Sequence, residues 1–203
     1  MRPNSAVVRK GSCMPLHEVM AFATGEQDVT EWVDGVLVRR VPIDNAFRKI
    51  NRELPGTLAR AVWQLRDRVS PLTARRFEDA VRSFRPDIVH FHNLSGLSHS
   101  LWQVPAAMGI PSIQVLHDLY LICPPSTMFR NGRNCRSRCT SCRTLRIGFA
   151  EASQAVSAVV GVSRFVLDRV TAEGLFANRP QRVIYNAIAQ PISPSVEPSP
   201  VRA

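Results

Sequence analysis

Three histidines stand at the ends of two apolar segments, where they could bind a ligand. His90 and His92 alternate with Val89 and Phe91, so both point to the same face of one predicted strand. His117 ends the next apolar run and is followed by Asp118. An imidazole at such a strand end can donate a hydrogen bond to a ligand oxygen, or it can simply bond the backbone. His90 and His92 could also ligate a metal, or they could serve only to pack the loop that follows.

Four of the five cysteines fall in one short loop and could hold a metal ion. They are Cys123, Cys135, Cys139 and Cys142, separated by eleven, three and two residues, while Cys13 stands apart. Four thiolates match structural zinc, which would replace the hydrophobic core that so polar a loop lacks. Neighbouring arginines would favour the thiolates and offset their charge. Four reduced thiols are the alternative. The last three cysteines also match, less well, the iron–sulfur motif of enzymes that use S-adenosylmethionine.

Alternating strand-like and helix-like segments predict where these side chains lie. Strands are expected at residues 17–24, 36–41, 87–92, 112–116, 158–162 and 182–185. Helices are expected at 58–84, divided by Pro71, and at 96–108, 145–156 and 164–173. Ser163 is expected to cap the last helix, since it lacks the glycine-flanked turn of a nucleophile, and Gly174 to end it. This order implies an α/β domain with a mostly parallel sheet flanked by helices. Ligands bind such sheets at the carboxyl ends of the strands, where the histidines stand.

The composition indicates one folded domain with a strong preference for anionic partners. The chain has 203 residues, 45% of them hydrophobic, and a net charge of +10 that comes almost wholly from arginine. Six arginines fall in a segment without acidic residues: Arg130, Arg133, Arg136, Arg138, Arg143 and Arg146. This basic loop fits a phosphate or a membrane surface, whereas nucleic acid is not expected because aromatic residues are not interleaved. Neither a membrane-spanning run nor a secretory signal is visible, so we expect a cytoplasmic protein, peripheral at the inner face of the membrane if it binds there.

Five segments in a fixed order resemble the N-terminal, acceptor-side domain of the family 4 glycosyltransferases, which are retaining enzymes with two Rossmann-like domains (the GT-B fold). They are His17–Val19, Arg85–His92, Gly109–Pro111 leading to His117 and Asp118, Val160–Leu167, and Val183–Asn186. The resemblance covers residues 17–190 and implies one Rossmann-like half of a GT-B fold. Residues 1–16 are expected to be an irregular end, because the family's first strand and glycine loop are not visible there. Residues 191–203 are expected to be a proline-rich linker or tail.

The resemblance implies transfer of a sugar, of the hexosyltransferase type, from a nucleotide-sugar donor to a glycolipid, a polysaccharide or another lipid-linked acceptor. His117 would lie beside the transferred sugar and the donor's pyrophosphate, and Asp118, Asn93 and Ser95 would contact substrate. No cofactor is expected for the chemistry. The family's C-terminal Rossmann domain makes most donor contacts, so these residues alone are expected to be inactive. The alternative is a non-catalytic binding module, or a split half that associates with a partner chain or a membrane surface.

Overall fold

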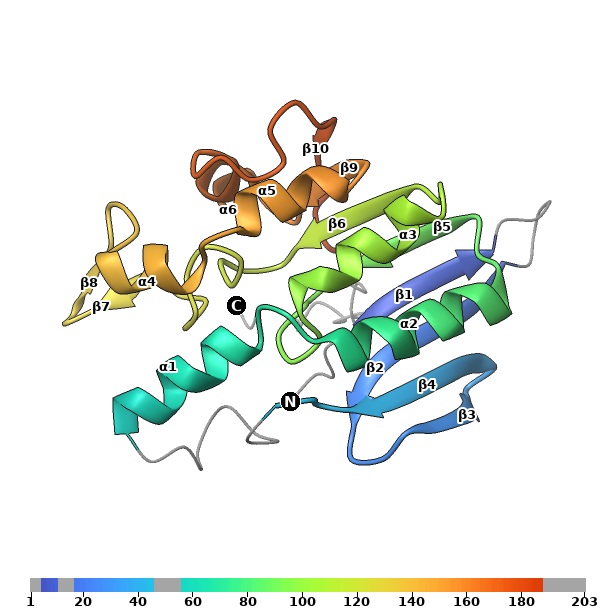
Figure 1. Cartoon of the computed structure of the whole chain (residues 1–203). Helices are drawn as coiled ribbons and strands as arrows, with labels where there is room; N and C mark the ends of the chain where they lie inside the picture. Colours follow the sequence, from blue (N-terminus) through green and yellow to red (C-terminus); the bar gives the residue numbers. More distant parts are fainter. Residues whose placement is uncertain (1–4, 11–16, 46–55, 188–203) are drawn as a thin grey trace, which may run out of the picture.

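A computed structural model describes residues 5–10, 17–45 and 56–187 of the chain (Figure 1). Eight strands of these residues form one sheet, in the order β10-β9-β6-β5-β1-β2-β4-β3. They are β1 (Ser5–Lys10), β2 (Glu18–Gly25), β3 (Val29–Val33), β4 (Val36–Pro42), β5 (Ile88–Phe91), β6 (Ser112–Leu116), β9 (Ala158–Gly161) and β10 (Gln181–Val183). The short strands β7 (Phe129–Arg130) and β8 (Arg133–Asn134) form a separate sheet. The expected tail at 191–203 lies outside the described residues.

One half of the large sheet is wholly parallel. β10, β9, β6 and β5 pair in parallel, and so do β2 and β4, which makes four of the seven strand pairings parallel. The helices α2 (Pro71–Phe84) and α3 (Gln103–Ala107) lie across one face of the sheet (Figure 1). This arrangement confirms the predicted Rossmann-like α/β class. His90 lies opposite Ile113, so the carboxyl ends of β5 and β6 meet at one edge.

The other half of the sheet departs from the sequence-based prediction at two strands. Residues 1–16 were expected to be irregular, but Ser5–Lys10 forms β1, which pairs antiparallel with both β2 and β5. No strand was predicted between the expected strands at 17–24 and 36–41, but this segment contains β3, which pairs antiparallel with β4. Asp34 and Gly35 join β3 to β4 with φ of 49° and 78°. Positive φ at both central residues is the geometry of a tight hairpin turn, which Asp-Gly favours.

Proline divides the long helical segment as expected. α1 (Gly56–Arg66) ends before Pro71, and the proline is the first residue of α2. The Ser70 hydroxyl accepts a hydrogen bond from the amide of Thr73 at 3.3 Å and so caps α2. Ser163 does the same for α6 (Arg164–Thr171), where its hydroxyl accepts from the amide of Val166 at 3.3 Å. The predicted role of Ser163 as a helix cap is therefore confirmed.

The predicted helix over 96–108 is mostly a turn and short helical pieces. The chain turns at Gly96, forms the 3₁₀ helix η1 (His99–Trp102) and then the five-residue α3. Gly96 has φ of 81°, and a Cβ there would lie 3.0 Å from the Cδ1 atom of Ile43, so the turn needs glycine. The segment predicted as a helix over 145–156 is likewise divided. It comprises the end of α4 (Thr140–Leu145), α5 (Phe149–Ala152) and the 3₁₀ helix η2 (Ser153–Ala155).

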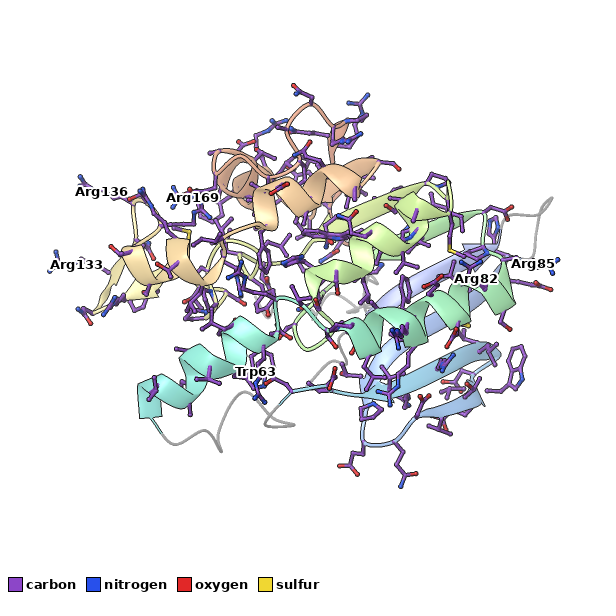
Figure 2. The ribbon with its side chains drawn as sticks, viewed as in Figure 1. Trp63, Arg82, Arg85, Arg133, Arg136 and Arg169 are labelled. Carbon is purple, nitrogen blue, oxygen red and sulfur yellow. The ribbon has the colours of Figure 1, made fainter. Side chains whose placement is uncertain are left out.

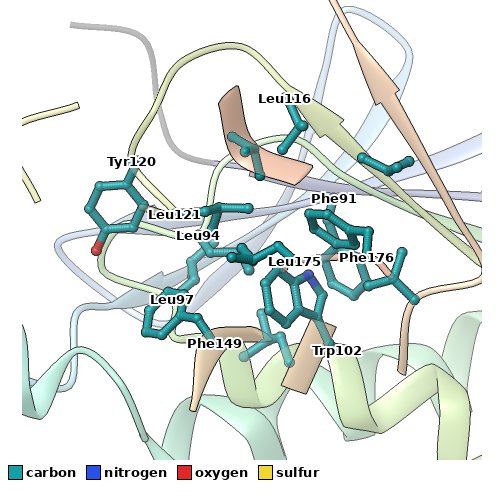
Figure 3. Packing of buried hydrophobic residues seen from close by; sticks show 14 of the residues in the cluster. Phe91, Leu94, Leu97, Trp102, Leu116, Tyr120, Leu121, Phe149, Leu175 and Phe176 are labelled. Atoms are coloured by element: carbon teal, nitrogen blue, oxygen red, sulfur yellow. The ribbon is translucent and has the colours of Figure 1, made fainter. Parts of the chain in front are cut away.

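Aromatic side chains fill the core between the sheet and its helices (Figure 3). Phe77 of α2 is fully buried, with its ring centroid 5.0 Å from that of Phe22 and 5.9 Å from that of Phe91. Trp102 packs edge-on to Phe176 at 5.7 Å. Its indole NH donates to the Gln114 side-chain oxygen at 2.9 Å, so the buried polar group is satisfied.

The apolar spacing that predicts α1 does not mark its buried face. Leu58 and Leu65, two residues of that spacing, are 79% and 48% exposed. The face of α1 that packs inward instead carries Trp63, 1% exposed, with Gln64 beside it, and Asp67 follows the helix (Figure 2). Among the described residues, no helix is long and apolar enough to cross a membrane.

Candidate functional site

A small pocket opens at the carboxyl ends of β5 and β6. The two strands are parallel neighbours, so the loops that follow them leave the sheet side by side. This is the edge at which open α/β sheets bind ligands. The pocket is lined by His92, Asn93, Leu94, Gln114, Val115, Leu116, His117, Asp118, Tyr120 and Leu121. Three of the four predicted catalytic and substrate-binding residues therefore line one pocket.

Two histidines from neighbouring strand ends are hydrogen-bonded in this pocket. His92 Nδ1 lies 2.9 Å from His117 Nε2, and the ring centroids are 5.2 Å apart. One of the two nitrogens must carry the proton and the other must accept it, so the tautomers of the two rings are linked. His90 stacks behind His92 at 6.5 Å. The described residues contain no group of three or more His, Cys, Asp or Glu side chains placed to hold a metal ion, His90 and His92 included.

Asp118 and Asn93 each fold the loop that follows their strand. The Asp118 carboxylate accepts a hydrogen bond from the amide of Tyr120 at 2.7 Å, and the Asn93 side-chain oxygen accepts from the amide of Ser95 at 2.9 Å. Such turns hold a polar side chain in a fixed place at the rim of a pocket. Ser95 does not line the pocket and lies beside the Tyr120 hydroxyl instead.

A buried carboxylate supports the pocket from behind. The Tyr120 hydroxyl donates to Asp67 Oδ2, and the amide of Gly96 donates to Asp67 Oδ1 at 2.8 Å. Asp67 is only 6% exposed, and its burial raises its pKa to about 6 despite the opposing effects of the Tyr120 hydrogen bond and the Arg146 charge. Burial and the neighbouring Asp67 also raise the pKa of Tyr120, which keeps the phenol protonated.

Arg146 joins this carboxylate to the segment that carries the cysteines. Its Nε donates to the Tyr120 carbonyl and its Nη1 to the Gln64 side-chain oxygen, both at 2.9 Å. The guanidinium also lies 4.3 Å from the centre of the Tyr120 ring. We call Gln64, Asp67, Tyr120 and Arg146 the Tyr120 network. The sequence places Arg146 among surface arginines, yet it is 2% exposed, and no local pattern distinguishes it from the others.

The four predicted zinc ligands lie beyond the pocket, in the segment before Arg146. Cys139 Sγ is 3.4 Å from Cys142 Sγ and 3.1 Å from the Ser141 hydroxyl, which lowers the pKa of Cys139 to about 7. Burial, with the neighbouring thiols of Cys139 and Cys123, raises the pKa of Cys142. Cys123 is buried and Cys135 is partly buried. Since no metal-holding group is formed among the described residues, the zinc site stays a prediction.

Comparisons with known proteins identify the family to which this chain is similar. A family model described as Glycosyltransferase Family 4 matches residues 17–189. One similar protein is described as an uncharacterized 42.6 kDa protein in the cps region of Klebsiella pneumoniae. It is 26% identical over 155 residues, which make up 76% of this chain and 42% of that protein. The chain therefore spans less than half the length of this curated relative.

Proposed function

Because the chain belongs to Glycosyltransferase Family 4, we propose that it forms the acceptor-side half of a retaining glycosyltransferase. The sugar, a hexose, passes from a nucleotide-sugar donor to a hydroxyl of a glycolipid or polysaccharide acceptor. In this transfer the bond from the anomeric carbon to the diphosphate breaks. A bond from the same carbon to the acceptor oxygen forms on the same face, and the hydroxyl proton passes to the departing diphosphate. The observation that most supports the proposal is the histidine pair at the carboxyl ends of β5 and β6.

His117 is the proposed catalytic residue. Its Nε2 faces His92, so a proton on its Nδ1 atom would donate to a sugar hydroxyl or to a phosphate oxygen of the leaving group. A fixed donor aimed at developing charge stabilises a transition state more than a ground state. Asp118 and Asn93 hold the two loops that border the acceptor, and the proposed chemistry requires no cofactor.

The donor is expected to be held between this pocket and a second Rossmann domain. Turnover requires donor and acceptor to be held in register. We therefore expect the 203 residues alone to show little transfer and to show activity when supplied with a C-terminal family 4 domain. The arginines of the cysteine-containing segment would contact acceptor phosphate or an anionic membrane surface.

The test is an assay of nucleoside diphosphate release with a panel of nucleotide sugars, in protein that pairs this chain with a C-terminal family 4 domain. We expect His117→Ala to lower kcat by about 10²–10³-fold, because a preorganised donor is lost. His17→Ala is the control, since His17 stands at the amino end of β2, and its kcat should stay close to the parent value. Unchanged kcat in His117→Ala would overturn the assigned role. Acceptor binding without turnover of any donor would favour the non-catalytic binding module.

A further inference from the structure

The segment from residue 123 to residue 142, called here the cysteine loop, has almost no hydrophobic interior of its own. All four residues of β7 and β8 are exposed, and α4 buries none of its side chains. Between residues 129 and 145 no side chain is fully buried, and five are partly buried: Cys135, Arg138, Cys139, Cys142 and Leu145. Figure 1 shows β7, β8 and α4 standing out from the body beyond the carboxyl end of β6. The interior of this projection is thus made largely of sulfur, and apolar burial gives it little stability.

The thiols are spaced more like metal ligands than like a disulfide. Zinc–sulfur bonds of about 2.3 Å place the sulfurs of a tetrahedral site about 3.8 Å apart. The sulfurs of Cys139 and Cys142 are 3.4 Å apart, far beyond a disulfide bond, and all four thiols are free. Cys123 contributes a third thiol beside that of Cys142. Two residues between Cys139 and Cys142 match the short spacing of paired ligands in zinc proteins.

The fourth thiol is presented by a hairpin whose base is held to the body. The amide of Cys135 donates to the Met128 carbonyl at 2.7 Å and closes the β7–β8 hairpin. Arg169 of α6 donates from Nη2 to the Cys135 carbonyl at 3.1 Å and from Nη1 to the Arg136 carbonyl at 2.9 Å. Cys135 also packs against the core cluster that contains Cys123. Cys135 and Cys142 thus both pack against the core cluster to which Cys123 belongs.

The charges around the loop suit an anionic metal centre. Zinc bound by four thiolates carries a net charge of −2. From Leu119 to Ala150 the sequence contains no acidic residue. No carboxylate of this segment therefore repels the negatively charged zinc centre. The Arg130 side chain lies beside the Cys139 thiol. Figure 2 shows Arg133, Arg136 and Arg169 at the same end of the molecule.

We propose that Cys123, Cys135, Cys139 and Cys142 bind one zinc ion and that this ion holds the cysteine loop in its folded form. Since the described residues do not form a metal-holding group, binding requires the four thiols to move closer together. Each thiol gives up its proton as its sulfur bonds to zinc, so four protons are released and affinity rises with pH. With four protein ligands the ion has no open position, so its role is structural.

The first test measures metal content in the full chain purified without chelator. We expect about one zinc ion per chain in the parent protein and in Cys13→Ser, which removes the one cysteine outside the loop. The double variant Cys139→Ser/Cys142→Ser should retain less than about a tenth of that amount. Zinc below about a tenth of an ion per chain in the parent protein would overturn the proposal.

A second measurement needs no loop variant and so does not depend on whether a variant folds. Co²⁺ added to the metal-free chain should give the intense visible absorption of a tetrahedral cobalt thiolate. Thiol labelling of Cys13→Ser should modify the loop cysteines only after a chelator is added. The weak spectrum of octahedral cobalt, or equal labelling with and without chelator, would contradict the proposal. Neither readout involves sugar transfer, so each outcome is independent of the proposed activity.

Discussion

Two titratable residues, the buried Asp67 and the partly buried His99, respond to pH in opposite directions. Asp67 is held by Tyr120 and Gly96, and its pKa is raised to about 6 by burial. His99 lies 4.4 Å from the Phe149 ring centroid, and neither of its ring nitrogens has a hydrogen-bond partner in the described structure. Burial, and then the charge of Arg68, lower the pKa of His99 to about 4. Both residues therefore titrate away from their ordinary ranges, and they do so within one pH window.

Replacing either residue should reveal how the other residue makes the free energy of unfolding depend on pH. The stability that Asp67 contributes is present below pH 3.8 and is lost as pH rises through about 6, because its folded pKa is the higher. The contribution of His99 is present above pH 6.5 and is lost as pH falls toward about 4. In Asp67→Asn the free energy of unfolding should rise between pH of about 4.5 and about 6.5, by on the order of 2 kcal/mol. In His99→Gln it should fall over the same range.

Urea unfolding at several pH values measures these slopes. The parent protein is the control, because the two contributions oppose each other there and should leave a flatter profile than either variant. If Asp67→Asn follows the parent profile, Asp67 is not protonated with the raised pKa that its burial indicates.

The sequence identifies the residues at strand ends but not the residues that support them from a distance. His117, Asp118 and Asn93 follow apolar strands, and strand ends are visible as a change from apolar to polar residues. Ser95 follows the same strand but turns toward Tyr120, because Asn93 bends the loop. Asp67 reaches the same place from α1 across more than fifty residues of sequence. A single sequence carries no local mark of that contact.

At the scale of elements, the Tyr120 network links three segments that are distant in the chain. Gln64 belongs to α1, Tyr120 to the loop after β6, and Arg146 follows α4 directly. The guanidinium of Arg146 fills the space between them, with hydrogen bonds to two of the three segments. The end of the cysteine loop is therefore held beside one wall of the pocket.

Arg146→Leu should destabilise the protein strongly, whereas Arg143→Leu should not. Loss of the Arg146 guanidinium leaves the Tyr120 carbonyl and the Gln64 amide buried without their donors, so we expect a loss of about 2–4 kcal/mol in the free energy of unfolding. Arg143 lies on the exposed side of α4, and its replacement should change that free energy by less than about 0.5 kcal/mol. Chemical denaturation measures both values. Equal, small effects would show that the network contributes nothing to stability.

Elements with strong local patterns are predictable here, and those made by distant pairing are not. β6 was predicted at its observed bounds because its five residues are bounded by Pro111 and His117. The division of the helices follows from Pro71 alone. β3, by contrast, has five exposed residues, and only the Asp34-Gly35 turn indicates its hairpin. α1 was predicted as a helix, but the buried Trp63 lies off the apolar stripe that indicates it.

At the scale of the whole molecule, two pairs of arginines lie at opposite ends of the domain. Arg133 and Arg136 extend from the β7–β8 end, and Arg82 and Arg85 lie at the far end of α2 (Figure 2). Both groups contribute to the net charge of +10, but only the first stands at the end toward which the carboxyl end of β6 points (Figure 1). Removing charge at one end or at the other therefore tests which end of the domain makes the proposed membrane contact.

Charge removal at the β7–β8 end should weaken binding to anionic vesicles. A basic residue near an anionic surface contributes about 1 kcal/mol, so Arg133→Gln/Arg136→Gln should lower the partition coefficient by about 10–30-fold. Arg82→Gln/Arg85→Gln removes the same charge at the other end and should have a smaller effect. Co-sedimentation with vesicles of anionic or of neutral lipid measures the bound fraction at low and high salt. An equal loss in both variants would mean that net charge alone attracts the protein.

The antiparallel strand β1 has a consequence for the order in which the sheet is made. β1 and β2 are close in the sequence, so they can pair soon after both leave the ribosome. The other partner of β1 is β5, and the pairing of Ala6 with Phe91 has to wait until all of α1 and α2 has been synthesised. Until then the middle of the future sheet is an open edge, able to pair with another chain. We expect aggregation during synthesis to begin at this edge, and a chaperone that delays it to increase the yield of folded protein.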